Sequence, residues 1–286
     1  MNLTNFGVWI GRSVPQSDYG AAAGLAEELG FGALWLGGSP RLPVTRELLA
    51  ATERLVIATG IVNIWQYEPA ELTREFHELD GEFPGRLLLG VGIGHPEATS
   101  EYQKPLTKSR EFLDGLAAAA RPVPRDRLAL AALGPKMLDL SAERTLGAHP
   151  YFVPVEHTKF ARQRLGAGPL LAPELAVAID SDPERGRAAA RKYAAMYLRL
   201  SNYTGNLRRF GYDDSDIDDG GSDALMDAVV PSGSAEHAAS VVGAHIAAGA
   251  DHVCIQTVGV SGVPAEQWTA VAAALGIWEG SVSGVS

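Results

Sequence analysis

The sequence is poor in the residues that build disulfide frameworks, metal centres and nucleic-acid surfaces. It has one cysteine, Cys254, so an internal disulfide framework is excluded, and its seven histidines show no Cys/His spacing typical of a metal site. Its cationic residues are scattered, and the formal net charge of -10 argues against a nucleic-acid partner. No window approaches the ~20 apolar residues of a membrane span, and the first residues lack the regions of a signal peptide. We therefore expect a soluble cytoplasmic protein that binds neither nucleic acid nor a membrane, and we expect no metal.

What the chain does have is a regular alternation of apolar β-type runs and amphipathic helical segments. The 46% hydrophobic content supports a substantial core, and no linker-like stretch divides the chain. The pattern predicts strands over residues 6–10, 31–36, 54–65, 86–92, 128–133, 148–153, 174–179 and 251–258. Helices are expected between them, including a long one that begins at Asp182-Pro183, a good N-cap and first-turn pair. This order predicts a (β/α)8 barrel as a single domain over residues 1–286, with its site at the carboxyl ends of the strands.

The stretch Arg86–His95 is central to this interpretation. Its apolar residues show no polar alternation, as in a parallel strand covered on both faces. Gly90, Gly92 and Gly94 then remove side chains at the carboxyl end of the strand, where a planar ligand can approach and meet His95. An equal alternative is that the glycines only relieve crowding at the end of a sheet. An open doubly wound sheet is the competing fold, but the spacing G-x-G-x-G and the polar loop after it do not match its dinucleotide fingerprint.

The segment 201–223 differs in composition from the rest of the chain. It is rich in Asn, Gly and Tyr and contains a run of acidic residues over 213–219. We expect it to be irregular and to cover the site, because the strand and helix order resumes after it.

If the fold is a barrel, its strand ends nominate the site residues: Gly38, Ser39, 60–63, 92–95, 132–136, 149–151 and Gln256. The segment Gly134-Pro-Lys136 begins a helix whose free N–H groups suit a phosphate, although on its own the segment is better explained as an ordinary helix start with Pro at the first position. His95 and His149 lie where an imidazole can transfer a proton, and Gly60 suggests a bulge or a close approach of the backbone. Trp65 either lines the mouth of the barrel or packs above its strand. No Ser-His-Asp order, P-loop or paired-carboxylate motif is present.

Several of these segments together resemble the luciferase-like monooxygenase superfamily, in particular its branch of coenzyme F420-dependent oxidoreductases. The matching segments, which follow the order of that superfamily over nearly the whole chain, are 59–65, 68–70, 84–94, 131–137, 147–148 and 247–255. The resemblance implies a (β/α)8 barrel with a deazaflavin or flavin ring at the carboxyl ends of the strands. It also implies a non-prolyl cis peptide at or beside Gly60-Ile61 and a cofactor phosphate at 132–136.

The resemblance assigns roles to particular residues. His95 takes the place of an acidic residue in some sugar-phosphate dehydrogenases of the branch and becomes the candidate proton donor. Where those enzymes have a histidine after the second strand, this chain has Gly37-Gly-Ser39, so their catalytic scheme does not transfer directly. The expected cofactor-binding residues are Gly38, Ser39, Gly60, Ile61, Asn63, Gly92, Gly94, Ala131, Ala132, Leu133, Gly134, Pro135 and Lys136. The expected substrate pocket contains Trp65, His149, Tyr151 and Tyr203.

From the resemblance we expect an F420-dependent oxidoreductase that moves a hydride between the deazaflavin and a small organic substrate. The cofactor would supply the chemistry and the barrel its position and electrostatics. The first alternative is an FMN-dependent monooxygenase on the same fold. The second is a non-catalytic flavin-binding or interaction protein, which the absence of a titratable group in Gly37-Gly-Ser39 keeps open. The resemblance also implies a homo-oligomer such as a homodimer.

Overall fold

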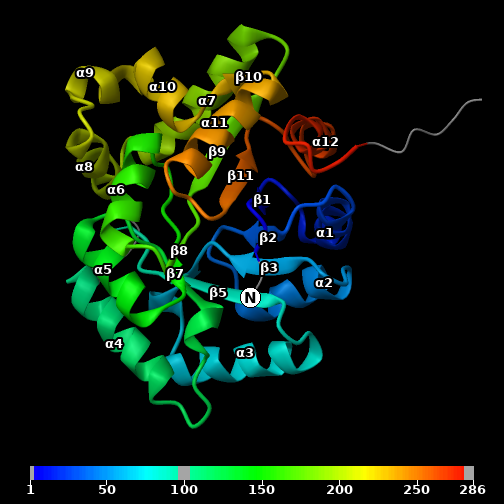
Figure 1. Cartoon of the computed structure of the whole chain (residues 1–286), viewed down its shortest axis with the longest axis vertical. Helices are drawn as coiled ribbons and strands as arrows, with labels where there is room; N and C mark the ends of the chain where they lie inside the picture. Colours follow the sequence, from blue (N-terminus) through cyan, green and yellow to red (C-terminus); the bar gives the residue numbers. More distant parts are fainter. Residues whose placement is uncertain (1–2, 96–103, 280–286) are drawn as a thin grey trace, which may run out of the picture.

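The computed structural model describes residues 3–95 and 104–279 and shows a parallel β-sheet surrounded by helices (Figure 1). The strands are β1 (Phe6–Ile10), β2 (Ala33–Leu36), β3 (Val56–Thr59), β4 (Val62–Asn63), β5 (Leu87–Gly92), β6 (Leu128–Leu130), β7 (Gly147–Ala148), β8 (Leu170–Leu171), β9 (Glu174–Ile179), β10 (Ser232–Gly233) and β11 (Val253–Thr257). Hydrogen-bonded neighbours follow the order β10-β9-β11-β1-β2-β3-β5-β6-β7-β8, and β4 pairs with β5.

The sheet closes into a barrel at the segment 170–179, where Pro173 separates β8 from β9. The backbone N–H of Ala172 donates to the carbonyl of Ala148, and that of Glu174 donates to the carbonyl of Pro150, both at 2.9 Å. On its other side β9 pairs with β11, which in turn pairs with β1. The two short strands β8 and β9 therefore form one barrel strand interrupted by a proline that lacks an N–H. The predicted (β/α)8 barrel is confirmed.

Alternation along the strands separates the barrel interior from the helix-facing side. Val8, Leu34 and Ile57 belong to the large cluster packed under the helices, whereas Trp9 and Trp35 belong to a smaller cluster together with small residues of other strands. Successive side chains of a strand point to opposite faces, so this second cluster fills the inside of the barrel. Two indole rings thus occupy the interior, and the inward-facing positions near the carboxyl ends are left small.

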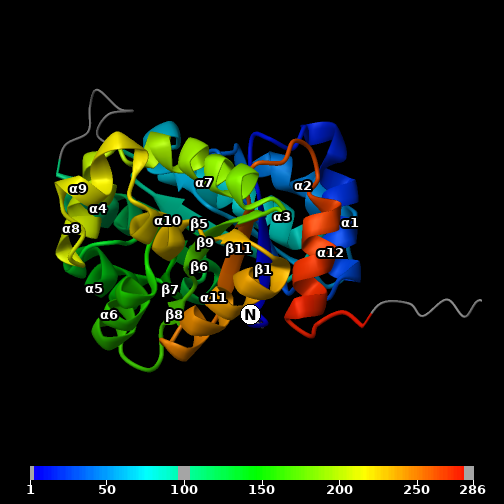
Figure 2. The ribbon, with the colours of Figure 1, turned by 90° about the horizontal axis from the view of Figure 1, so that it is seen from above.

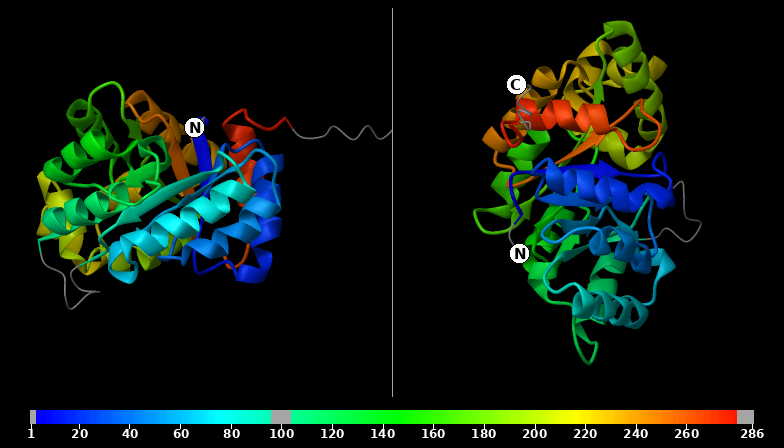
Figure 3. Two further views of the ribbon diagram at one scale, coloured as in Figure 1. Left: turned by 90° about the horizontal axis from the view of Figure 1, so that it is seen from below. Right: turned by 90° about the vertical axis from the view of Figure 1, so that its right-hand side faces the viewer.

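The helices form a ring outside the sheet, and Figure 3 shows α12 beside α1, where the two ends of the ring meet. The wall consists of α1 (Tyr19–Glu28), α2 (Thr45–Ala50), α3 (Pro69–Glu82), α4 (Pro105–Ala117), α5 (Pro135–Arg144), α6 (Val155–Leu165), α11 (Ala235–Ala247) and α12 (Ala265–Ala274). Short 3-10 turns precede three of them, namely η1 (Gln16–Asp18), η2 (Leu42–Val44) and η3 (Ile64–Gln66), and another, η5 (Arg125–Arg127), precedes β6. Because α6 packs against α11, these two helices are neighbours in the wall although four further helices separate them in sequence.

Those four helices form an insertion between β9 and α11, which we call the cover. It comprises α7 (Pro183–Tyr197), α8 (Ser201–Arg209), α9 (Asp214–Ile217) and α10 (Asp223–Val229), with η6 (Asp218–Gly220) between the last two. Figure 2 shows the cover gathered on one side of the molecule. The prediction of an irregular segment over 201–223 is wrong, because polar residues there cap short helices. Asp213 and Asp216 make a capping box for α9, and the Ser222 hydroxyl accepts from Leu225 N–H at 3.1 Å.

Several element ends also differ from the sequence prediction. The strand predicted over 54–65 is divided into β3 and β4 by the cis peptide bond between Gly60 and Ile61, which the resemblance implied. The strand predicted over 148–153 stops at Ala148, because Pro150 follows one residue later and cannot donate to a ladder. The polar loop predicted after His95 falls mainly on 96–103, outside the described residues. In the described part of the chain, no helix combines the length and the hydropathy needed to cross a membrane.

Candidate active site

A cavity of about 1390 Å³ lies at the carboxyl ends of the barrel strands, under α7 and α8 of the cover. It is larger than the roughly 300–1,000 Å³ of most small-molecule pockets, so it has room for a large ligand together with a second, smaller one. Its wall also differs in charge from the rest of the chain. Among the described residues that line it there is no Asp or Glu, whereas Arg12, Lys192 and Arg209 are cationic. In a chain with a net charge of -10, this distribution favours an anionic ligand.

The floor of the cavity is a stack of aromatic rings inside the barrel. The His149 ring lies 4.2 Å from that of Trp35 and 5.7 Å from that of Trp9, nearly parallel to both. A Cβ at Gly37 or Gly60 would lie 2.2 Å from the Trp9 indole, so only glycine fits at these two strand ends. The glycines at these strand ends, where the sequence analysis expected room for a ligand, therefore first make room for the Trp9 indole.

His149 is part of this floor and is neutral. Its Nδ1–H donates to the carbonyl of Ala172 at 2.7 Å, which leaves Nε2 as a buried acceptor without a protein partner. Burial lowers the pKa of His149 to about 4. An imidazole with this pKa carries no extra proton near pH 7, so the structure favours a supporting role over proton donation.

The end of β5 and the cover meet at His95. Gly94 and His95 line the cavity beside Asn63 and the cis peptide at Gly60-Ile61. The His95 ring lies 5.2 Å from the ring of Tyr203 in α8. His95, which follows the strand at the centre of the sequence interpretation, thus lies against Tyr203, a cover residue that was also predicted to belong to the pocket.

The start of α5 is the most suitable place for an anionic group. Gly134 is the N-cap residue of α5. Because glycine has no side chain, it cannot accept a hydrogen bond from the first N–H groups of the helix. The adjacent carbonyl of Leu133 accepts from Nε2 of His157 at 2.9 Å. Burial lowers the pKa of His157 to about 4, and the positive charge of Arg209 lowers it further. Arg209 is therefore close enough to this loop to add its charge to the helix dipole.

A group of tyrosine hydroxyls gathers around Gln256 at the end of β11. The Tyr151 hydroxyl lies 2.7 Å from that of Tyr193, 2.9 Å from that of Tyr197 and 2.8 Å from Gln256 Oε1. All four side chains line the cavity. Glu174 is fully buried behind them, and its Oε1 lies 3.4 Å from the Tyr193 hydroxyl. We call these five residues the tyrosine network.

Most residues nominated from the sequence line the cavity. They are Gly38, Ser39, Gly60, Ile61, Asn63, Ile93, Gly94, His95, Ala131, Ala132, Leu133, Gly134, His149, Tyr151, Tyr203 and Gln256. Six others do not, namely Val62, Trp65, Gly92, Pro135, Lys136 and Pro150. Trp65 packs beside the rim and donates from its indole Nε1 to the carbonyl of Ile93 at 3.0 Å. Gly92 lies within β5 against Ala131, and Lys136 is exposed on α5, because the helix turns its side chain away from the mouth.

Sequence reasoning missed Trp9, Arg12 and the residues of α7. Tyr193 and Tyr197 are four residues apart and so share a helix face, but such a pair is also typical of ordinary packing. A more informative signal was Glu174, a carboxylic acid in an otherwise apolar strand.

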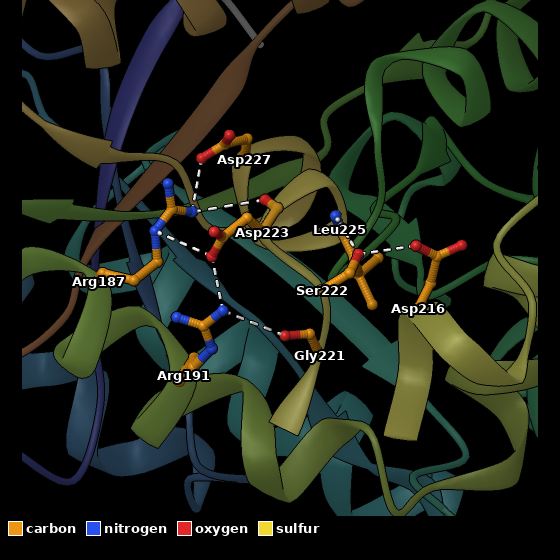
Figure 4. Close-up of polar contacts among 8 residues, drawn as sticks. All are labelled: Arg187, Arg191, Asp216, Gly221, Ser222, Asp223, Leu225 and Asp227. Carbon is orange, nitrogen blue, oxygen red and sulfur yellow. Dashed lines mark hydrogen bonds and ion pairs between the residues drawn. The ribbon is translucent and has the colours of Figure 1, made fainter. Parts of the chain in front are cut away.

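Ion pairs connect two helices of the cover, α7 and α10 (Figure 4). Arg187 in α7 pairs with Asp227 in α10 at 2.6 Å, and Arg191 pairs with Asp223 at 2.6 Å. Exposed pairs of this kind stabilise by less than about 1 kcal/mol each. Their effect is to hold α10 against α7, whose other face lines the cavity.

The comparisons with known proteins agree with one another on a family. A family model described as "Luciferase-like monooxygenase" matches residues 2–252. An F420-dependent glucose-6-phosphate dehydrogenase of Microbacterium testaceum is 33% identical over 104 residues, 28% of this chain and 31% of that protein. An N-acetyl-S-alkylcysteine monooxygenase of Bacillus subtilis is 29% identical over 130 residues, 40% of this chain and 39% of that protein. The matches thus span between three and four tenths of these curated relatives.

Solved structures share the fold over nearly the whole chain. An F420-dependent secondary alcohol dehydrogenase with an F420-acetone adduct superposes with a TM-score of 0.74 at 16% identity, covering 96% of this chain and 99% of the other. The oxygenating constituent of 3,6-diketocamphane monooxygenase of Pseudomonas putida, in complex with FMN, gives 0.69 at 14% identity, covering 94% and 96%. At such identities the likeness establishes the barrel fold alone.

Proposed function

Because the chain belongs to the luciferase-like monooxygenase family, we propose that it is a coenzyme F420-dependent oxidoreductase acting on a small organic substrate. The observation that carries this proposal is the cavity wall, which has no described carboxylate and places Arg209 beside the start of α5. A phosphate-bearing cofactor suits such a wall, because cations and free helix N–H groups both stabilise an anion. The match to an F420-dependent relative supports the choice of deazaflavin.

The described residues fit such a group in two respects. The start of α5, from Ala132 to Gly134, together with Arg209 would hold the phosphate. Gly60-Ile61 and Asn63 would support the ring, where the backbone of β3 and β4 lines the cavity without large side chains. When bound, a deazaflavin supplies hydride chemistry at its reactive carbon. His95, which the sequence analysis predicted as the proton donor, lies at the same rim.

An FMN-dependent monooxygenase is the second candidate. A monooxygenase is among the curated relatives, and a structural neighbour is described in complex with FMN. Both cofactors carry a phosphate, so the cationic wall of the cavity does not by itself distinguish between them. The partners we propose are a small-molecule substrate and a second copy of the chain in a homodimer; the cytoplasmic location stays a prediction.

Equilibrium binding of F420 and of FMN to the purified apoprotein tests the proposal. We expect F420 to bind at least about tenfold more tightly, a difference of about 1.4 kcal/mol. Equal or inverted dissociation constants would contradict the deazaflavin assignment. If FMN binds more tightly, and the reduced complex then consumes oxygen, the monooxygenase is the correct function.

A further inference from the structure

The tyrosine network contains a buried carboxyl group, that of Glu174, without a cationic partner among the residues that the structure describes. Glu174 is 0% exposed, and no ion pair within the described ranges includes it. Its Oε2 accepts from the backbone N–H of Phe152 at 3.2 Å, and its Oε1 faces the Tyr193 hydroxyl at 3.4 Å. The titratable groups that face it are the tyrosines of α7, α8 and the β7 end, and Cys254 of β11. None of them carries a positive charge, so burial favours the neutral carboxylic acid.

These surroundings explain why the pKa of Glu174 is raised. Burial raises it to about 8, although the hydrogen bonds from Phe152 N–H and Tyr193 oppose the shift. Glu174 is therefore mostly protonated at pH 7, and its O–H can donate to Tyr193.

A protonated Glu174 sets the direction of the hydrogen bonds in the network. Each tyrosine hydroxyl has one hydrogen to donate and can accept more than one hydrogen bond. If Tyr193 accepts from Glu174, it can donate to Tyr151 at 2.7 Å, and Tyr151 can donate to Gln256 Oε1 at 2.8 Å. If Glu174 is ionised, Tyr193 donates to the carboxylate and no longer to Tyr151. The protonation of Glu174, which does not line the cavity, thus decides whether Tyr193 can donate to Tyr151.

We propose that Tyr151 is the proton donor to a carbonyl substrate in this cavity, and that Glu174 restores its proton through Tyr193. The inference rests on the proposed function, since the cofactor, when bound, supplies the hydride. The substrate's carbonyl carbon gains that hydride, and the electron pair of the C=O bond goes to the oxygen, which takes the proton of Tyr151. Tyr151 then takes the hydrogen of Tyr193, which takes that of Glu174. After the product leaves, a proton from water in the cavity returns through Tyr151 and Tyr193 to the buried carboxylate. Tyr151 is the catalytic residue, whereas Tyr193 and Glu174 act through it.

The first test needs neither cofactor nor substrate. Infrared difference spectra of the whole chain, wild type minus Glu174→Gln, should show the C=O band of a protonated carboxyl at pH 7. The band should disappear as the pH rises through about 8. An ionised Glu174 at pH 7 overturns the proposal. If Glu174→Gln does not fold, the difference between wild-type spectra at pH 7 and pH 9 gives the same information. Because this measurement requires no ligand, failure of both F420 and FMN to bind would refute the proposed function and leave this result standing.

The second test compares two tyrosines that contact the same Tyr151 hydroxyl. The probes are reduced F420 with cyclohexanone, benzaldehyde and pentan-2-one, without oxygen. Tyr151→Phe should lower the hydride-transfer rate by about 10²-fold or more, and Tyr193→Phe by at least about tenfold, both with unchanged cofactor affinity. The matched control Tyr197→Phe removes a hydroxyl outside the path, so its effect should be clearly smaller. The wild-type rate should fall above pH 8 and that of Glu174→Gln should not. Equal effects of Tyr193→Phe and Tyr197→Phe, or no reaction of any carbonyl probe with F420 bound, overturn the proposal.

Discussion

Replacing Gly134 by Asp tests where the cofactor phosphate binds and hardly disturbs the fold. Gly134 has φ -83° and ψ 161°, an extended conformation that any residue adopts, and an added Cβ would meet nothing within 4 Å. Asp is also a preferred N-cap residue, so α5 should keep its stability or gain a few tenths of a kcal/mol to about 1 kcal/mol. The thermal unfolding midpoint of the variant should therefore equal or exceed that of the wild type.

The effect on cofactor affinity should be large and opposite. A carboxylate at the N-cap would lie roughly 4–6 Å from a phosphate bound at the helix start. At an effective dielectric constant of about 20, two like charges at this distance repel by about 3–4 kcal/mol. This corresponds to a dissociation constant raised by roughly 10²–10³-fold.

Gly134→Asn is the matched control, because it has the same shape and capping ability without the charge. Titration of F420 into wild type, Gly134→Asn and Gly134→Asp should give similar affinity for the first two and a large loss for the third. The loss should shrink as salt is added, since screening weakens the repulsion. If Asp and Asn weaken binding equally, shape is responsible; if neither does, the phosphate binds elsewhere.

Three further predictions concern the floor, the rim and the buried histidines. Gly60→Ala puts a Cβ 2.2 Å from Trp9 and should cost about 1–3 kcal/mol in chemical denaturation. Gly81→Ala, in α3 with nothing within 4 Å, should instead stabilise by up to about 1 kcal/mol; equal effects would show that the floor is not tightly packed. His95→Ala tests the sequence prediction against the proposal for Tyr151: a proton donor would lose about 10²–10⁴ in the single-turnover rate at unchanged cofactor affinity, while a small loss, or an equally active His95→Asn, would leave His95 only a hydrogen-bonding role. Burial lowers the pKa of four histidines from 6.5 to about 4. As the pH falls, these histidines therefore take up protons in the unfolded chain before they do so in the folded chain. Their contribution to stability is present above pH 6.5 and is lost as the pH falls through about 4. Melting temperatures measured from pH 7.5 to 4 should show this loss, and His157→Gln should make it less steep; an unchanged slope would contradict the assignment. The four are His149, His157, His245 and His252.

The sequence by itself determined the barrel and most of its strand ends. Apolar runs without alternation, such as that after Arg86, require cover on both faces, and this is a property of the segment alone. The Asp182-Pro183 pair likewise predicted the start of α7, where the Asp182 side chain accepts from two backbone N–H groups. The site residues found in this way lie on strand ends, because the carboxyl ends of parallel strands all meet at one mouth.

The tertiary structure alone decided which residues outside the strand ends reach that mouth. Arg209, Lys192 and Tyr193 belong to helices inserted between β9 and α11, and no local pattern shows that the insertion folds over the cavity. The acidic run that suggested an irregular loop caps a short helix instead, since Asp213 and Asp216 bond to backbone N–H groups of α9, and the neighbouring η6 and α10 pack on α7. Glu174 gave a local signal, a carboxyl in an apolar strand. Its protonation depends on the absence of any nearby cation, which is a property of the assembled interior and not of the segment that carries it.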